Sequence, residues 1–321
     1  MAHAIGRGRL HPGQLPGVAA CWVIIAALGA CQPDARQATG APTQNEDPIA
    51  VPSLTTPATG PAPIAPPAVK LEAPPAPPAA PAPELIALQV PGYRDAVVGL
   101  PAGASPPRPV VVAVHGNYDR VEPFCETFTQ VSSQWAFVLC PRGQPRVDAG
   151  TRADRWTFGW NGRDLEREID AGLKALKQRY GAQVSDGPMV FAGFSLGAIL
   201  GADIVLWKAK RYTRAILVEG GTANWSLSTA KTFARGGGQR MMFACGQEQC
   251  VKDTRVGLYW LELAGVEART AYAGTIGHTY EGIVAEEMTR QWAWLTEGDP
   301  RWPSAQGSAG PLARREPPRE P

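Results

Sequence analysis

A serine between two glycines is the residue of this sequence best placed to do covalent chemistry. Residues 193–197 read Gly-Phe-Ser-Leu-Gly, after the apolar run 189–192 and before 198–202, which is predicted to be helical. A sharp turn from strand to helix needs glycine on both sides because side chains would clash there, and it exposes the central Ser195. The following helix directs its N-terminal dipole at that serine. The pattern predicts a nucleophilic serine, and the alternative is a structural Gly-Ser-Gly turn.

A serine hydroxyl needs a general base before it can act as a nucleophile. The candidate is His278, which lies 83 residues downstream in the small-residue segment 274–280, after a predicted strand. Ser195 would attack an acyl carbonyl while His278 accepts the proton and later returns it. A single histidine in a glycine-rich loop is commonly a surface residue, so this interpretation depends on the serine motif upstream.

The segments that must position these residues alternate between short apolar runs and longer runs with helical periodicity. That order predicts a mainly parallel sheet with helices on both faces and a ligand site beyond the carboxyl ends of the strands. The expected strands are 85–90, 96–100, 109–114, 135–139, 188–192, 215–218, 240–244 and 268–273, and the expected helices are 121–133, 162–180, 196–212, 253–264 and 282–296.

Four motifs at the ends of these strands resemble those of the α/β-hydrolase family. They are His-Gly-Asn at 115–117, Cys-Pro-Arg-Gly at 140–143, the serine turn at 193–197 and Gly-His at 277–278. The resemblance covers nearly the whole predicted domain. It implies an α/β-hydrolase fold without a large cap domain, most similar to the phospholipase/carboxylesterase and dienelactone-hydrolase-like branches.

The resemblance also implies how a tetrahedral oxyanion would be held. Its donors would be the backbone N–H of Leu196 and one from the loop after His115, that of Asn117. By the same resemblance, His115 would be a structural residue of this loop.

The acid of the expected triad departs from the family pattern. The family usually has an aspartate three residues after the glycine that ends its seventh strand, and here Gln249 occupies that position. Glu219 is favoured instead, because a carboxylate that ends an apolar strand needs a partner. Glu248 is adjacent to the expected position, and Asp253 begins a predicted helix, where it could equally be a cap. For all three, an ordinary hydrogen bond is the alternative role.

Aromatic residues gather near the predicted carboxyl ends of the strands. They include the segment 154–160, Tyr118 and Trp225. Such residues could bind an acyl or aryl group at the rim of a pocket, and they could equally pack the core.

The N-terminus has the features of an export signal. Arg7 and Arg9 precede an apolar run at 18–30, which is short for a membrane span. Residues 28–31 read Leu-Gly-Ala-Cys and resemble the lipobox of bacterial lipoproteins, in which the cysteine, here Cys31, is lipidated. By the same resemblance, Gln32 would favour the outer membrane. An ordinary signal peptide or an uncleaved anchor is the alternative.

Proline marks the boundaries of the chain's parts. Between Gln32 and Pro83 lie 15 of the 32 prolines, in a composition that cannot bury enough apolar surface to fold. The expected organisation is a signal peptide at 1–30, a disordered tether at 31–83, a hydrolase domain at 84–298 and a disordered tail at 299–321.

The cysteine count predicts disulfides. Four of the six cysteines would remain in the exported domain: Cys125, Cys140, Cys245 and Cys250. An even number predicts two bridges, with three connectivities open. We favour Cys125 with Cys140, which ties a helix to the next strand, and Cys245 with Cys250, which closes a short loop. Neither spacing is a metal-binding pattern.

The charge balance disfavours a nucleic-acid binder. Lys and Arg number 31, Asp and Glu number 29, and the chain has no long basic run. The sequence therefore predicts an exported serine hydrolase, anchored to the membrane through its N-terminal lipid, that cleaves small-molecule carboxylic esters without metal or organic cofactor. Alternatives are a peptidase or acyltransferase on the same scaffold, and a surface-anchored binding module that has lost activity.

Overall fold

The computed structural model describes residues 82–103, 107–148 and 154–303. Contacts divide the chain into Met1–Pro74 and Pro75–Pro321, and all described residues belong to the second unit. The predicted signal peptide, Cys31 and nearly all of the predicted tether therefore lie outside the described residues, as does 304–321.

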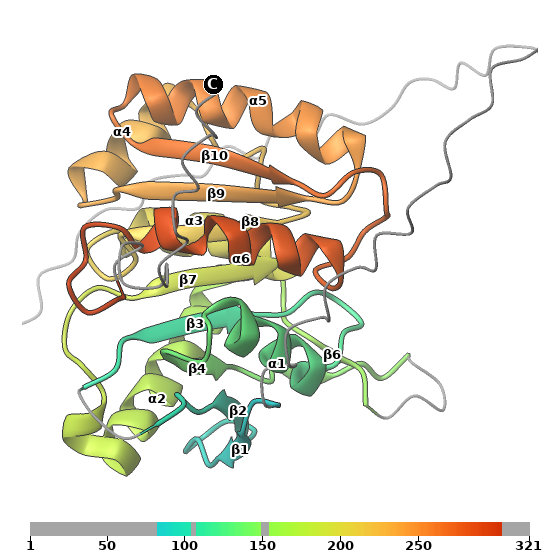
Figure 1. The fold of residues 1–321 in the computed structure, drawn as a ribbon. Helices are drawn as coiled ribbons and strands as arrows, with labels where there is room; N and C mark the ends of the chain where they lie inside the picture. Colours follow the sequence, from blue (N-terminus) through green and yellow to red (C-terminus); the bar gives the residue numbers. More distant parts are fainter. Residues whose placement is uncertain (1–81, 104–106, 149–153, 304–321) are drawn as a thin grey trace, which may run out of the picture. The chain divides into compact units, whose positions relative to one another are not determined.

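One sheet organises the described domain (Figure 1). Its strand order is β1-β2-β4-β3-β7-β8-β9-β10, in which β1, β2 and β4 pair antiparallel and the strands from β4 to β10 run parallel. The strands are β1 Leu85–Leu88, β2 Ala96–Gly99, β3 Val110–Val114, β4 Phe137–Cys140, β7 Val190–Phe194, β8 Arg214–Val218, β9 Arg240–Cys245 and β10 Glu267–Tyr272. Parallel strands place the residues that follow them at one edge of the sheet, where a site can form.

Helices cover both faces of the sheet. They are α1 Val121–Val131, α2 Gly162–Tyr180, α3 Leu196–Trp207, α4 Leu227–Arg235, α5 Glu248–Leu263 and α6 Ile283–Thr296. Helices α1 and α6 lie together on one face, which is the near face in Figure 1. Helices α2, α3, α4 and α5 contribute their buried residues to the other face. No described helix is long and apolar enough to cross a membrane.

The pleat of the central strands explains why the core has two halves. In β3, Val110, Val112 and Val114 belong to the cluster under α2 and α3, whereas Val111 and Ala113 belong to the cluster under α1 and α6. Side chains alternate between the faces of a strand, so a strand covered on both sides must be apolar throughout. The predicted mainly parallel sheet with helices on both faces is confirmed, and no large cap domain lies among the described residues.

Four elements differ most from the prediction. Helix α3 ends at Trp207 rather than at 212, because the backbone leaves the helical conformation at Lys208, with φ −124 and ψ 35. Helix α5 begins at Glu248, so Asp253 lies inside it rather than at its start. Helix α4, which opens with a capping box at Ser226, and the small hairpin of β5 (Gln144–Pro145) and β6 (Trp156–Thr157) were not predicted.

The packed chain also continues past the predicted boundary at Gly298. Trp302 is buried, and its ring lies 5.4 Å from that of Trp292 in α6. Asp299 pairs with Arg301 at 2.5 Å and faces Arg214 at 3.9 Å. Residues 299–303 therefore belong to the domain and not to the tail.

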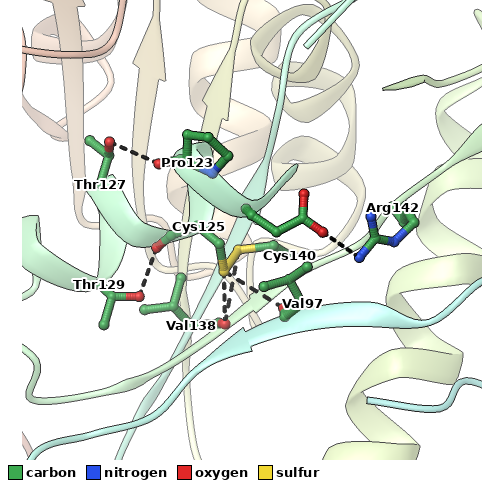
Figure 2. The surroundings of a disulfide bond; sticks show 9 residues. Val97, Pro123, Cys125, Thr127, Thr129, Val138, Cys140 and Arg142 are labelled. Carbon is green, nitrogen blue, oxygen red and sulfur yellow. Dashed lines mark hydrogen bonds and ion pairs between the residues drawn. A yellow bond between two sulfur atoms is a disulfide. The ribbon is translucent and has the colours of Figure 1, made fainter. Parts of the chain in front are cut away.

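Both favoured cysteine pairings are present as disulfides. Figure 2 shows Cys125 of α1 bonded to Cys140 at the end of β4. The sulfur atom of Cys125 lies 3.6 Å from the carbonyl oxygen of Val97 and 3.5 Å from that of Val138. This bridge fastens α1 to the sheet. The second disulfide joins Cys245, the last residue of β9, to Cys250 in the first turn of α5.

The two disulfides should differ in what they add to stability. The Cys125–Cys140 bridge closes a separation of 15 residues and the Cys245–Cys250 bridge a separation of 5. On the chain-entropy model, Cys125→Ala/Cys140→Ala lowers the free energy of unfolding by about 3 kcal/mol and Cys245→Ala/Cys250→Ala by about 2 kcal/mol. Urea unfolding of both double variants and the wild type measures this, and equal or reversed losses would contradict it.

Candidate active site

Ser195 occupies a strained turn between β7 and α3. Its backbone has φ 51 and ψ −114, and it is the N-cap of α3. A side chain on Gly193 would place its Cβ 2.5 Å from the carbonyl oxygen of Gly197, and one on Gly197 would place its Cβ 2.1 Å from that of Val114. Neither position admits a side chain, so the two glycines are what allow the turn to form.

The loop after β3 lies directly against this turn. A Cβ on Gly116 would be 3.2 Å from the Cβ of Ser195 and 2.9 Å from the ring of Phe194. The N–H of Gly116 donates to Asp119 at 3.3 Å. The next N–H along the loop is that of Asn117, while Leu196 opens α3, so its own N–H has no acceptor within the helix. The two predicted oxyanion donors therefore come from segments that meet at Ser195.

The side chain of Asn117 fastens this loop to the hairpin of β5 and β6. Its Oδ1 accepts hydrogen bonds from Thr157 at 2.8 Å and from Arg146 at 3.2 Å. The next residue, Tyr118, adopts a left-handed conformation with φ 63. An oxyanion donor is effective when it is held in place before the reaction.

His115 is buried beneath the same loop. Its Nδ1 lies 2.7 Å from the carbonyl oxygen of Gly116, its Nε2 lies 3.1 Å from that of Arg142, and its ring lies 4.5 Å from that of Phe158. Burial lowers the pKa of His115, which favours the neutral imidazole. These contacts place His115 as a link between the loops that follow β3 and β4.

His278 lies against Phe194, the residue before Ser195, and faces a buried carboxylate. Its Nδ1 is 3.3 Å from Oε2 of Glu219, and its ring centroid is 4.8 Å from that of Phe194, the residue before the serine. The His278 side chain is 46% exposed and that of Glu219 only 3%. None of the hydrogen bonds among the described residues joins His278 to Ser195. Catalytic hydrogen bonds commonly tighten only when substrate binds.

Of the three candidate acids, only Glu219 contacts His278 within the described part of the chain. Glu248 is exposed and lies 3.8 Å from Lys252 on its own helix. Asp253 accepts a hydrogen bond from Gln249 at 2.7 Å. Asp253 and Gln249 nevertheless line a cavity of about 150 Å³ that also reaches Glu219 and His278.

Left-handed backbone conformations concentrate at this edge of the sheet. Tyr118, Ser195 and Glu219 follow β3, β7 and β8, and their φ angles are 63, 51 and 52. For residues other than glycine such conformations are unfavourable by roughly 1–3 kcal/mol and persist only where the surroundings impose them. The segments that follow three neighbouring strands therefore each contain a strained residue.

Sequence reasoning missed a hydrogen bond that joins the loops around the site. The hydroxyl of Tyr280 donates to Asp119 at 3.2 Å, and the same carboxylate accepts from Gly116. Burial, together with the charge of Asp119, raises the pKa of Tyr280, so its hydroxyl stays a donor. The position of Tyr280 two residues after His278 was the one available signal; nothing in the sequence pointed to Asp119.

The aromatic candidates divide between packing and exposure. Trp225 is buried against Phe233 and Phe243, with ring centroids 5.7 and 6.5 Å away, so it belongs to the core. Trp160 is 76% exposed. Phe158 lines a separate cavity of about 380 Å³ with Tyr93 and Glu168.

Comparisons with known proteins give structural likeness only. No family model and no curated protein matches the chain. It is similar to TT1662 from Thermus thermophilus, with 14% identity, a TM-score of 0.48 and coverage of 67% of this chain and 98% of that one. A putative dienelactone hydrolase from Klebsiella pneumoniae has 13% identity, a TM-score of 0.48 and coverage of 67% of this chain and 98% of that one. The Bacillus cereus carboxylesterase has 16% identity, a TM-score of 0.43 and coverage of 62% of this chain and 93% of that one.

Proposed function

We propose that this protein is a serine hydrolase that cleaves carboxylic esters through an acyl-enzyme on Ser195. The observation that carries the proposal is the meeting of three strand ends. A strained serine follows β7, a buried carboxylate follows β8, and the histidine after β10 lies 3.3 Å from that carboxylate. Nucleophile, base and acid in this relation form a catalytic triad, which is recognised by geometry rather than by position in the sequence.

The proposed reaction follows from these positions. Because the Glu219 carboxylate can only accept, Nδ1 of His278 carries the proton and Nε2 is free to take one from Ser195. The serine oxygen then attacks the ester carbonyl, and the N–H groups of Leu196 and Asn117 stabilise the oxyanion. The C–O bond to the alcohol breaks, and His278 protonates the departing alcohol. Water repeats the sequence on the acyl-enzyme and releases the acid.

Exposure of the base leaves it accessible to an ester substrate. With 46% of its side chain exposed, His278 is open to a molecule arriving from solvent. No contact among the described residues favours a peptidase or an acyltransferase on this scaffold.

Ser195 should react with a fluorophosphonate probe. The activated serine oxygen forms a bond to phosphorus and fluoride leaves, so intact-mass spectrometry should show one adduct per chain, and Ser195→Ala should show none. Ser226→Ala, at the cap of α4 and outside the site, is the matched control and should label normally. An unlabelled wild-type protein would instead support the non-catalytic binding module.

Glu219→Gln should lower kcat strongly while retaining the shape of the site. The amide oxygen still accepts a hydrogen bond, but the negative charge that stabilises the protonated imidazole is lost. Loss of the acid in other serine-histidine-acid triads suggests a fall of roughly 10⁴-fold. Hydrolysis of a short-chain aryl ester measures the change, with Glu248→Gln and Asp253→Asn as controls expected to stay near wild type. Near-normal turnover by Glu219→Gln would show that this carboxylate is not the acid.

We further propose that the enzyme is exported and held at the bacterial outer membrane or cell envelope by a lipid on Cys31. The support is the sequence alone: a basic start, an apolar run and Leu-Gly-Ala-Cys at 28–31. The two disulfides agree with this, because such bonds persist in oxidising compartments.

Cys31→Ser should abolish lipid attachment. The variant should accumulate as an unprocessed precursor or move from the membrane to the soluble fraction, because the acceptor thiol is missing. Fractionation with metabolic labelling by a fatty-acid analogue measures this, and Cys21→Ser, within the same signal, is the control. Continued lipid labelling of Cys31→Ser would place the anchor elsewhere.

A further inference from the structure

The backbone of Gly246 contacts both members of the acid–base pair. Its N–H donates to Oε1 of Glu219 at 2.5 Å. Its carbonyl oxygen accepts from the N–H groups of Ile276 and Gly277, at 2.8 and 2.9 Å. Gly277 directly precedes His278, so this one residue orients the carboxylate and also holds the loop that carries the imidazole.

The contact leaves no space for a side chain. A Cβ on Gly246 would lie 2.6 Å from the carbonyl oxygen of Gly277, 3.1 Å from Ile276 and 3.2 Å from Val284. The loop after β9 and the loop after β10 therefore touch backbone to backbone. A shift of Gly246 away from β10 would release both hydrogen-bonded partners.

The Cys245–Cys250 disulfide encloses this residue. Cys245 ends β9 and Cys250 lies in the first turn of α5, so the bridge closes the chain around Gly246. Both cysteines are buried, and their sulfur atoms and a carboxylate oxygen of Glu219 lie within 4.8 Å of one another. The bridge thus packs against the carboxylate that faces His278.

We propose that the Cys245–Cys250 disulfide is a positioning element for the Glu219–His278 pair, acting through the backbone of Gly246. The inference rests on the proposed hydrolase function. In this loop the family pattern would supply the acid from position 249, which is Gln249 here. The loop instead contributes a backbone donor to an acid from β8, and the covalent bridge keeps that donor in register. The cysteines do not touch substrate.

The test compares Cys245→Ala/Cys250→Ala with Cys125→Ala/Cys140→Ala, which removes the disulfide of α1 and β4. Misplacement of catalytic groups lowers the rate without weakening substrate binding, so the first variant should lose kcat by about 10- to 100-fold with little change in KM. The matched control should lose stability but keep kcat. Each variant is also combined with Glu219→Gln.

Combination with Glu219→Gln separates positioning from general destabilisation. If the bridge acts through Glu219, removing it from the Glu219→Gln variant should lower kcat only slightly further. The losses in kcat of the two changes are then strongly non-additive. For the control, Cys125→Ala/Cys140→Ala, the fold-changes in kcat should multiply with that of Glu219→Gln. Gly246→Ala keeps the disulfide and should also lower kcat. This variant tests the inference if Cys245→Ala/Cys250→Ala does not fold.

A second readout does not depend on turnover. Side-chain 15N shifts report which nitrogen of His278 carries the proton, and we expect the Nδ1–H form in the wild type and a mixture in Cys245→Ala/Cys250→Ala and in Gly246→Ala. The inference is overturned if the His278 tautomer is unchanged in both variants and their kcat losses multiply with that of Glu219→Gln. Fluorophosphonate labelling of Ser195 would still support the hydrolase in that case. Absent labelling with the tautomer change present would overturn the hydrolase alone.

Discussion

The close approach of α3 to β3 governs the arrangement of the whole site. Gly197 has no side chain to keep its backbone from the carbonyl oxygen of Val114, where a Cβ would lie 2.1 Å away. The first turn of the helix can therefore rest on the strand end, and Ser195 is forced into a left-handed conformation at the top of β7. The same contact brings the loop of Gly116 against the serine. Ser195 and the loop of Gly116 are adjacent because two backbones touch.

A second constraint is electrostatic. The Glu219 side chain is 3% exposed, and a buried carboxylate is unfavourable unless hydrogen bonds replace its lost hydration. Here the N–H of Gly246 serves one oxygen and His278 faces the other. Burial thus makes the carboxylate dependent on its two neighbours, and this dependence orients the imidazole. Strain at Tyr118, Ser195 and Glu219 is maintained by the sheet, whose strands end side by side.

Local patterns were enough to predict the sheet and the serine turn. Apolar runs, helical periodicity and Gly-x-Ser-x-Gly are properties of neighbouring residues, so they can be read from one chain. Glu219 was favoured over Glu248 and Asp253 because it ends an apolar strand, although only the fold shows which acid faces His278. The start of α5 at Glu248, the bond from Tyr280 to Asp119 and the double role of Gly246 depend on how distant loops meet, which no local pattern encodes.

The participation of Gly246 through backbone atoms has a further consequence for how this loop can vary. The hydrogen bonds of the Gly246 N–H and C=O groups do not depend on the side chains at positions 247–249. With Glu219 as the proposed acid, none of these three residues has to supply it. Gln247 and Gln249 instead line the cavity beside His278. That short stretch is a natural place for diversification: a library randomised there would alter the walls of the cavity without replacing Glu219 or His278.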